Sequence, residues 1–225
     1  MGLASYFDAM SLTIVGGGTL LATFLRCGTG DCRRALAAIG QIGRRRFDAD
    51  GARAELAVQV REIREDGLLR ANPHHFGDRE LDDATDALLG SRSVDALLAA
   101  HEAHKARRME ASNRAVRTLA QAAELAPVFG LAGTLISLAR LPAEGLSKGA
   151  YMGSISMAVL TTLYGLLLAN LLLAPLARMI ERAAAEEERE RQKLVDWLAQ
   201  QVAPAMPHRK PTIVAPGKVV AAASA

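Results

Sequence analysis

The sequence predicts an all-α integral membrane protein with three transmembrane helices, a helical cytoplasmic segment and a long last helix that extends into the cytoplasm. Half of the 225 residues are hydrophobic and 23% are charged, and the two kinds occupy separate stretches of the chain. Residues 150–177 contain no charged residue at all. No window alternates apolar and polar residues with a period of two, so we expect no β-sheet.

Three stretches are long and apolar enough to cross a bilayer. Residues 150–177 exceed the roughly 20 apolar residues that cross a hydrocarbon core of about 30 Å. Residues 1–25 form the first predicted span, with Asp8 as their only charge. Residues 118–140 form the second span, whose one acid is Glu124. The apolar core of this second span is short enough for a buried soluble helix, so its assignment depends on the neighbouring third span.

Arginines near the spans predict the topology. Residues 141–149 are a short periplasmic loop, so the second and third spans form a hairpin with both ends on one side. The positive-inside bias places the N-terminus outside and residues 26–117 and the C-terminus in the cytoplasm. We expect no signal-peptide cleavage, because no Lys or Arg precedes the first apolar run. The arginines that set this orientation are Arg33, Arg34, Arg44, Arg45, Arg46, Arg107, Arg108, Arg114, Arg117, Arg178 and Arg182.

The water-exposed parts show helical periodicity. In residues 26–117, short amphipathic helices are predicted, with breaks at Gly51, Asn72-Pro73 and Gly90. Their apolar positions are Leu56, Val60, Ile63, Leu88, Val94, Leu97 and Leu98. Residues 178–203 should continue the third span as a charged cytoplasmic helix, because no Gly or Pro follows Pro175 until Pro204. Residues 204–225, rich in proline, are expected to be a disordered tail.

The sequence offers few candidates for nucleic-acid binding, metal binding or catalysis. The net charge of +3 is too small for a protein that neutralises many phosphates, so nucleic acid is not an expected partner. Cys27 and Cys32 supply too few ligands for a zinc site, and no metal site is expected. The run from His101 to His104 lacks metalloprotease spacing and is interpreted as a solvated helix face. No nucleophile with a neighbouring base stands out, so an enzyme is not expected.

Small and hydroxylated residues recur on one face of each helix of the predicted hairpin. In the third span they are Ser154, Ala158, Thr162, Gly165 and Ala169, and in the second span Gly130, Gly133, Thr134 and Ser137. Such faces either let helices pack closely or line a water-filled ion pathway, and the pattern leaves both interpretations open. No span carries an acid near its centre. A conducting complex would therefore take its carboxylate from another subunit, with Thr134, Thr161 and Thr162 lining the path.

Three motifs, residues 8–23, 126–134 and 156–177, resemble in order the membrane helices of the ion-driven stator family that includes the flagellar motor proteins MotA and PomA. The resemblance implies a homopentameric ring in the bacterial inner membrane around a MotB-like partner, whose membrane Asp carries the ion. It also implies that H⁺ or Na⁺ flow rotates the ring against a rotor switch protein. No other cofactor is implied. The family's motor proteins usually have a further membrane helix before the position of Asp8.

The resemblance also suggests roles for single residues. Pro127 and Pro175 match the family's gating and torque prolines, and Thr162 matches its pore-lining threonine. The full predicted ion pathway is Thr134, Thr161, Thr162, Ser137 and Ala158. The hydroxyl of Thr134 can ligate Na⁺, but the resemblance does not decide whether the coupling ion is H⁺ or Na⁺. Arg64, with Arg61 and Arg70, is either the rotor contact or a solvated face.

Two other functions compete with the stator. An ExbB or TolQ type subunit, which energises outer-membrane processes, has three spans in this topology. A passive membrane scaffold would need no ion flux.

Overall fold

The computed structural model describes residues 8–42, 47–66, 77–139 and 148–205, and within these ranges the chain is almost entirely helical, with no β-strand. Three helices in this part of the chain are long and apolar enough to cross a membrane: Ala9–Gln41, Val94–Ala139 and Tyr151–Val202. The prediction of an all-α protein with three spans is confirmed.

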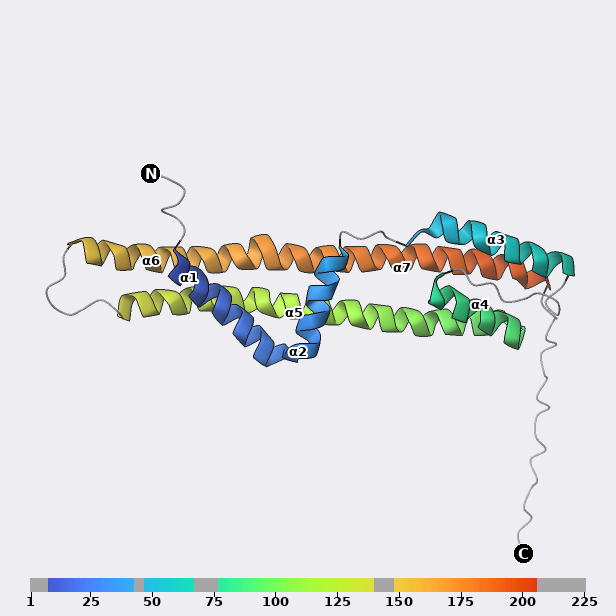
Figure 1. Ribbon diagram of the computed structural model, residues 1–225, viewed down its shortest axis with the longest axis horizontal. Coiled ribbons are helices and arrows are strands. Elements are labelled where there is room, and N and C mark those ends of the chain that lie inside the picture. Colours follow the sequence, from blue (N-terminus) through green and yellow to red (C-terminus); the bar gives the residue numbers. More distant parts are fainter. Residues whose placement is uncertain (1–7, 43–46, 67–76, 140–147, 206–225) are drawn as a thin grey trace, which may run out of the picture.

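Two long antiparallel helices run side by side along the molecule (Figure 1). One is α5 (Val94–Ala139), and the other is a continuous rod of α6 (Lys148–Leu167), η3 (Leu168–Leu173) and α7 (Ala174–Val202). At 1.5 Å per residue the rod is about 80 Å long, far more than a bilayer core. The predicted second span, residues 118–140, corresponds to the last part of α5. The helix begins well before this span and continues through position 117 without a break.

The rod changes its helical pitch just before Pro175. The η3 segment is a π-helix, and Pro175 lies in the first turn of α7. Proline has no N–H to donate, and its ring collides with the carbonyl one turn earlier, so a wider turn relieves both problems. Pro127, by contrast, lies inside α5.

The N-terminal helix crosses the long pair. It comprises α1 (Ala9–Leu12), the π-helix η2 (Thr13–Gly17) and α2 (Gly18–Gln41). A side chain added at Gly18 would overlap the ring of Phe129 in α5. Glycine therefore allows the close approach of this helix to α5.

Within α2 the chain turns sharply at Gly28, which has φ 78° and ψ 169°. Residues that carry a Cβ rarely adopt this backbone conformation, which is almost restricted to glycine.

We predict that Gly28→Ala lowers the free energy of unfolding by about 1–3 kcal/mol and displaces residues 29–41. The cost comes from the backbone conformation, because nothing lies within 4 Å of the added methyl. Trypsin should then cut faster at Arg33 and Arg34. Gly40→Ala, also in open space but in helical backbone, is the control; equal cleavage in the two variants would contradict the prediction.

The ends of the long helices that lie away from the predicted spans are covered by α3 (Ala49–Asp66) and α4 (Arg79–Ser91) (Figure 1). Of the apolar positions expected there, only Leu98 is well exposed, at 37%. The buried core is Leu56, Val60, Ile63, Leu81, Ala84, Leu88, Leu97, Leu194, Val195, Leu198 and Val202.

One predicted break in this region is wrong. Gly51 lies in the first turn of α3, where its N–H donates to Asp48 Oδ1 at 3.0 Å. Capping by Asp48 explains the earlier helix start. Most of the predicted loop 141–149 and tail 204–225 lies outside the described residues, although Lys148 and Gly149 begin α6 and Ala203–Ala205 form a 3₁₀ turn, η4.

Candidate ion-pathway face

The two C-terminal membrane helices meet through glycines. A Cβ at Gly165 would lie 2.7 Å from the carbonyl oxygen of Ala126 and 3.1 Å from the Cα of Gly130. A Cβ at Gly133 would lie 2.8 Å from the Cβ of Thr161. We call this contact, formed by Gly130, Gly133 and Gly165 with Thr161, the glycine seam. It holds α5 and α6 closer than any larger residues would allow.

Two predicted pathway residues lie inside this protomer. Thr161 is 0% exposed and Ser137 is 1% exposed. The Thr161 hydroxyl donates to the carbonyl oxygens of Met157 at 3.1 Å and Ala158 at 2.9 Å, and Ser137 donates to that of Gly133 at 2.8 Å. Their hydroxyls are thus satisfied by their own helices within the packed pair, while Ala158 is half-buried.

Thr134 and Thr162 lie at the edge of the pair, and both are half-buried. The Thr134 hydroxyl donates to the carbonyl of Leu131 at 2.6 Å, and the Thr162 hydroxyl donates to that of Ala158 at 3.4 Å. A hydroxyl that donates its one proton keeps oxygen lone pairs that accept a hydrogen bond or ligate a cation. Of the predicted pathway hydroxyls, these two are therefore available to a group outside the protomer.

The opposite face of α5 is apolar and exposed. Val128, Leu131, Leu135 and Leu138 are 56%, 58%, 68% and 47% exposed. In a membrane such side chains contact lipid or other subunits.

The acid of the first span is occupied as a helix cap. The Asp8 carboxylate accepts hydrogen bonds from the backbone N–H of Met10 at 3.2 Å and of Ser11 at 3.3 Å, and from the Ser11 hydroxyl. The backbone N–H of Asp8 donates to Tyr164 Oη at 3.3 Å. Tyr164 lies 13 residues from Ala177 and 14 from Ala150, so this contact brings the backbone of Asp8 close to the middle of the uncharged stretch 150–177.

One face of the N-terminal helix carries a row of buried residues that was not predicted from the sequence. Ser11, Val15, Thr19 and Thr23 recur every four residues and are 0%, 1%, 2% and 6% exposed. The Thr19 hydroxyl has no hydrogen-bond partner among the described residues. The same four-residue spacing of small and hydroxylated residues would have identified this face in the sequence.

Beside α3 and α4, a largely buried charge cluster joins α4, α5 and α7. Arg108 of α5 pairs with Glu188 of α7 at 2.7 Å and with Glu80 of α4. Arg191 of α7 pairs with Asp78, the N-cap of α4, at 2.7 Å. The Arg108 guanidinium therefore connects three helices and that of Arg191 connects two, and the cluster fixes α4 onto the long pair.

The interpretation of His101 and His104 as a solvated helix face is wrong. His101 is only 6% exposed, and its Nε2 lies 3.4 Å from Glu188 and 3.2 Å from Gln192 Oε1. His104 lies 3.2 Å from Asp83 of α4. The sequence did not reveal that α4 and α7 pack against this side of α5.

The three predicted rotor-contact arginines differ in their surroundings. Arg61 is exposed and pairs with Glu65 at 2.9 Å, and this hydrogen bond raises the pKa of Arg61. Arg64 donates to the Gln201 side chain at 2.8 Å and so ties α3 to the end of α7. Arg70 lies outside the described residues.

Residues that could hold a metal are not grouped in the part of the chain described here: it has no cluster of three or more His, Cys, Asp or Glu suited to an ion. Both cysteines are free thiols, and Cys27 Sγ lies 2.9 Å from Gln121 Oε1.

The fold and this face define a multi-pass helical membrane protein whose last two membrane helices pack through glycines and leave two threonines at their edge. The model of the MotA/TolQ/ExbB proton channel family matches residues 76–193. The chain belongs to this family, and it is a multi-pass protein of the bacterial inner membrane.

Similar proteins carry motor names. Over 202 residues the chain is 27% identical to motility protein A of Cereibacter sphaeroides, and this alignment covers 88% of this chain and 78% of that protein. It is 43% identical over 65 residues to motility protein A of Borreliella burgdorferi, an alignment that covers 29% of this chain and only 25% of that protein. The solved flagellar MotAB stator complex of Bacillus subtilis matches with a TM-score of 0.80 at 16% identity, covering 90% of this chain and 81% of that one.

Proposed function

We propose that this chain is the channel-forming subunit of a bacterial flagellar stator, which couples H⁺ or Na⁺ flow to rotation and torque on a rotor. Thr134 and Thr162 keep free acceptor lone pairs at the edge of the glycine seam, and this observation carries the proposal. The similarity to proteins named motility protein A supports the motor assignment over other members of the family.

The ion-carrying carboxylate is assigned to a second, MotB-like membrane protein. Asp8 is occupied as a cap, and Glu124 lies near the cytoplasmic end of its span. A partner helix with a carboxylate against Thr134 and Thr162 would complete a path in which hydroxyl oxygens replace part of the ion's hydration. Several copies of this chain around the partner, in a homopentamer, would supply equivalent faces, between which the carboxylate passes as the ring turns. No step requires enzyme chemistry.

The decisive variants are Thr162→Val and Thr161→Val. Valine keeps the shape of threonine and removes the hydroxyl, so each variant tests only the oxygen. With the partner co-reconstituted in liposomes, Thr162→Val should lower ion flux about tenfold, as expected for one lost contact to a charged group. Thr161→Val should keep near-normal flux, because its hydroxyl bonds only its own helix. The chain without its partner gives the baseline.

If flux were insensitive to Thr162→Val, or if the two variants lost flux equally, Thr162 would not line the path. Unchanged flux together with normal swimming would favour the passive scaffold.

For the rotor contact, we propose Arg61. Among the described residues its exposed guanidinium on α3 pairs with Glu65 of the same helix, whereas Arg64 is engaged by Gln201.

The ExbB or TolQ type of function is the second candidate, because the family includes those proteins and three candidate spans are present among the described residues. Co-purification separates the two. A partner with one membrane span and a peptidoglycan-binding domain supports the stator, and an ExbD-like partner supports the alternative.

A further inference from the structure

The second half of α2, residues 29–41, runs across the long helices rather than along them (Figure 1). The turn at Gly28, with φ 78°, produces this change of direction. We call residues 29–41 the crossing segment. Because the long helices span the membrane, a helix that lies across them runs along the membrane plane. The crossing segment precedes residues 76–193, which the family model matches.

The depth of the crossing segment follows from its packing. Ala35 is buried in a cluster with Ala115 and Leu119 of α5 and Ala177 and Ile180 of α7. Ala177 is the last residue of the uncharged stretch 150–177, and Arg178 follows it. The crossing segment therefore lies where the hydrocarbon core ends on the cytoplasmic side.

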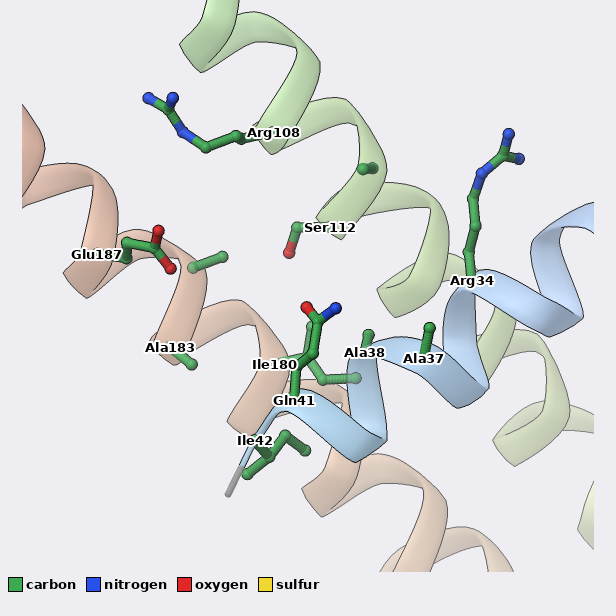
Figure 2. A pocket seen from close by; sticks show the side chains of 12 residues that line it. Arg34, Ala37, Ala38, Gln41, Ile42, Arg108, Ser112, Ile180, Ala183 and Glu187 are labelled. Carbon is green, nitrogen blue, oxygen red and sulfur yellow. The ribbon is translucent and has the colours of Figure 1, made fainter. Parts of the chain in front are cut away.

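The two sides of the crossing segment face different surroundings. A cavity of about 610 Å³ lies on one side, lined by Arg34, Ala37 and Gln41 together with Ser112 and Glu187 of the long helices. Figure 2 shows Gln41, Ser112 and Glu187 directed toward this space. Ser112 precedes the buried cluster in α5 and Glu187 follows it in α7, so the cavity is on the cytoplasmic side.

Leu36 lies on the other side. It is two residues from Arg34, which places it roughly opposite on a helix with 3.6 residues per turn. Leu36 is 70% exposed and does not line the cavity. An exposed leucine on the side that faces the bilayer is expected of an interfacial amphipathic helix.

Exposed arginines occur at this same level. Arg26 precedes the crossing segment and Arg33 lies in its first half. Arg117 lies between Ala115 and Leu119 of α5, and Arg178 follows Ala177. All four arginines are exposed. Basic side chains at this depth are complementary to the anionic headgroups of the cytoplasmic leaflet.

We propose that the crossing segment is an interfacial anchor, in which Leu36 inserts at the acyl boundary of the cytoplasmic leaflet and the surrounding exposed arginines bind anionic phospholipid headgroups. This role goes beyond ion transport and does not depend on which motor or outer-membrane system the chain serves. It assigns the lipid surface, rather than another protein, as the occupant of the exposed Leu36 face.

The test uses tryptophan fluorescence, because Trp197 is the only tryptophan in the chain. In the full chain carrying Trp197→Phe, Leu36→Trp and Gln41→Trp place one probe on each side of the crossing segment. Each variant is reconstituted in vesicles of phosphatidylethanolamine and phosphatidylglycerol with or without acyl-brominated lipid. Leu36→Trp should be quenched at least about twofold more than Gln41→Trp by the bromine atoms. Equal quenching, or a Leu36→Trp probe that neither bromolipid nor aqueous acrylamide reaches, would overturn the proposal, and the latter result would indicate a protein cover such as a second copy.

A second measurement tests the headgroups without altering Leu36. In the Arg26→Gln, Arg33→Gln double variant, phosphatidylglycerol retained per chain in native mass spectrometry should fall by about half. Arg189→Gln, an exposed arginine farther along α7, should retain the normal amount. Equal retention in both variants would refute anionic headgroup binding by this segment.

Discussion

Replacing Gly165 by alanine is expected to abolish motility and partner-dependent ion flux. The added methyl would lie 2.7 Å from the carbonyl oxygen of Ala126 and 3.2 Å from the Cα of Pro127. These are backbone atoms, so no side chain can rotate away, and α5 and α6 must separate. Separation moves Thr134 and Thr162 relative to each other, and a displacement of about 1 Å is enough to spoil a site built for charge. Swimming in soft agar and flux in liposomes measure the loss.

Gly153→Ala is the matched control, because it lies on the same helix with nothing within 4 Å of the added methyl. It should swim normally. Normal swimming of Gly165→Ala as well would show that the glycine seam is not needed for function.

A second large effect is expected for Arg108→Met. Methionine fills similar space but leaves Glu188 and Glu80 without their shared guanidinium, and Glu188 is only 8% exposed. Breaking a buried ion pair by removing one partner costs about 3–5 kcal/mol, and the lower value applies because Arg108 retains some exposure. The midpoint of thermal unfolding of the purified chain should fall clearly, with α4 the first helix to exchange its amide hydrogens.

Arg114→Met is the control for charge removal on the same helix. Arg114 bonds Glu110 and lowers the pKa of that carboxyl, but both groups are exposed. Solvent screens such pairs, so the midpoint should barely change. Similar midpoints for the two variants would contradict a stabilising role for the buried cluster.

The membrane spans could be predicted from the sequence because segregation of charge is a local property. The uncharged stretch 150–177 needs no knowledge of its neighbours to be identified as a span.

Which of Thr161 and Thr162 is buried in the seam, and which lies at its edge, could not be predicted from local properties. Adjacent residues differ by about 100° around a helix, so which one enters the seam depends on the register against Gly133. That register is a property of two helices together. The small-residue pattern put Thr162 on the face that carries Gly165, whereas the structure places Thr161 in the seam against Gly133 and leaves Thr162 half-buried.

Three of the features that sequence reasoning missed depend on tertiary contacts or on glycine. Gly28 could occupy an ordinary helix or a turn, and nothing local selects its positive φ. His101 has a polar neighbourhood in the sequence, and it is buried by tertiary packing, with Glu188 and Gln192 of α7 against its ring. Arg64 likewise has a partner, Gln201, far along the chain.

Cysteine cross-linking tests the central claim, that the edge carrying Thr162 faces the partner's carboxylate, most directly. With Cys27 and Cys32 replaced by serine, Thr162→Cys and Leu171→Cys are each paired with a cysteine one helical turn from the membrane carboxylate of the partner. Leu171 is 74% exposed and serves as the comparison position. The account predicts rapid disulfide formation from Thr162→Cys and little from Leu171→Cys; cross-linking from Leu171→Cys alone would contradict it.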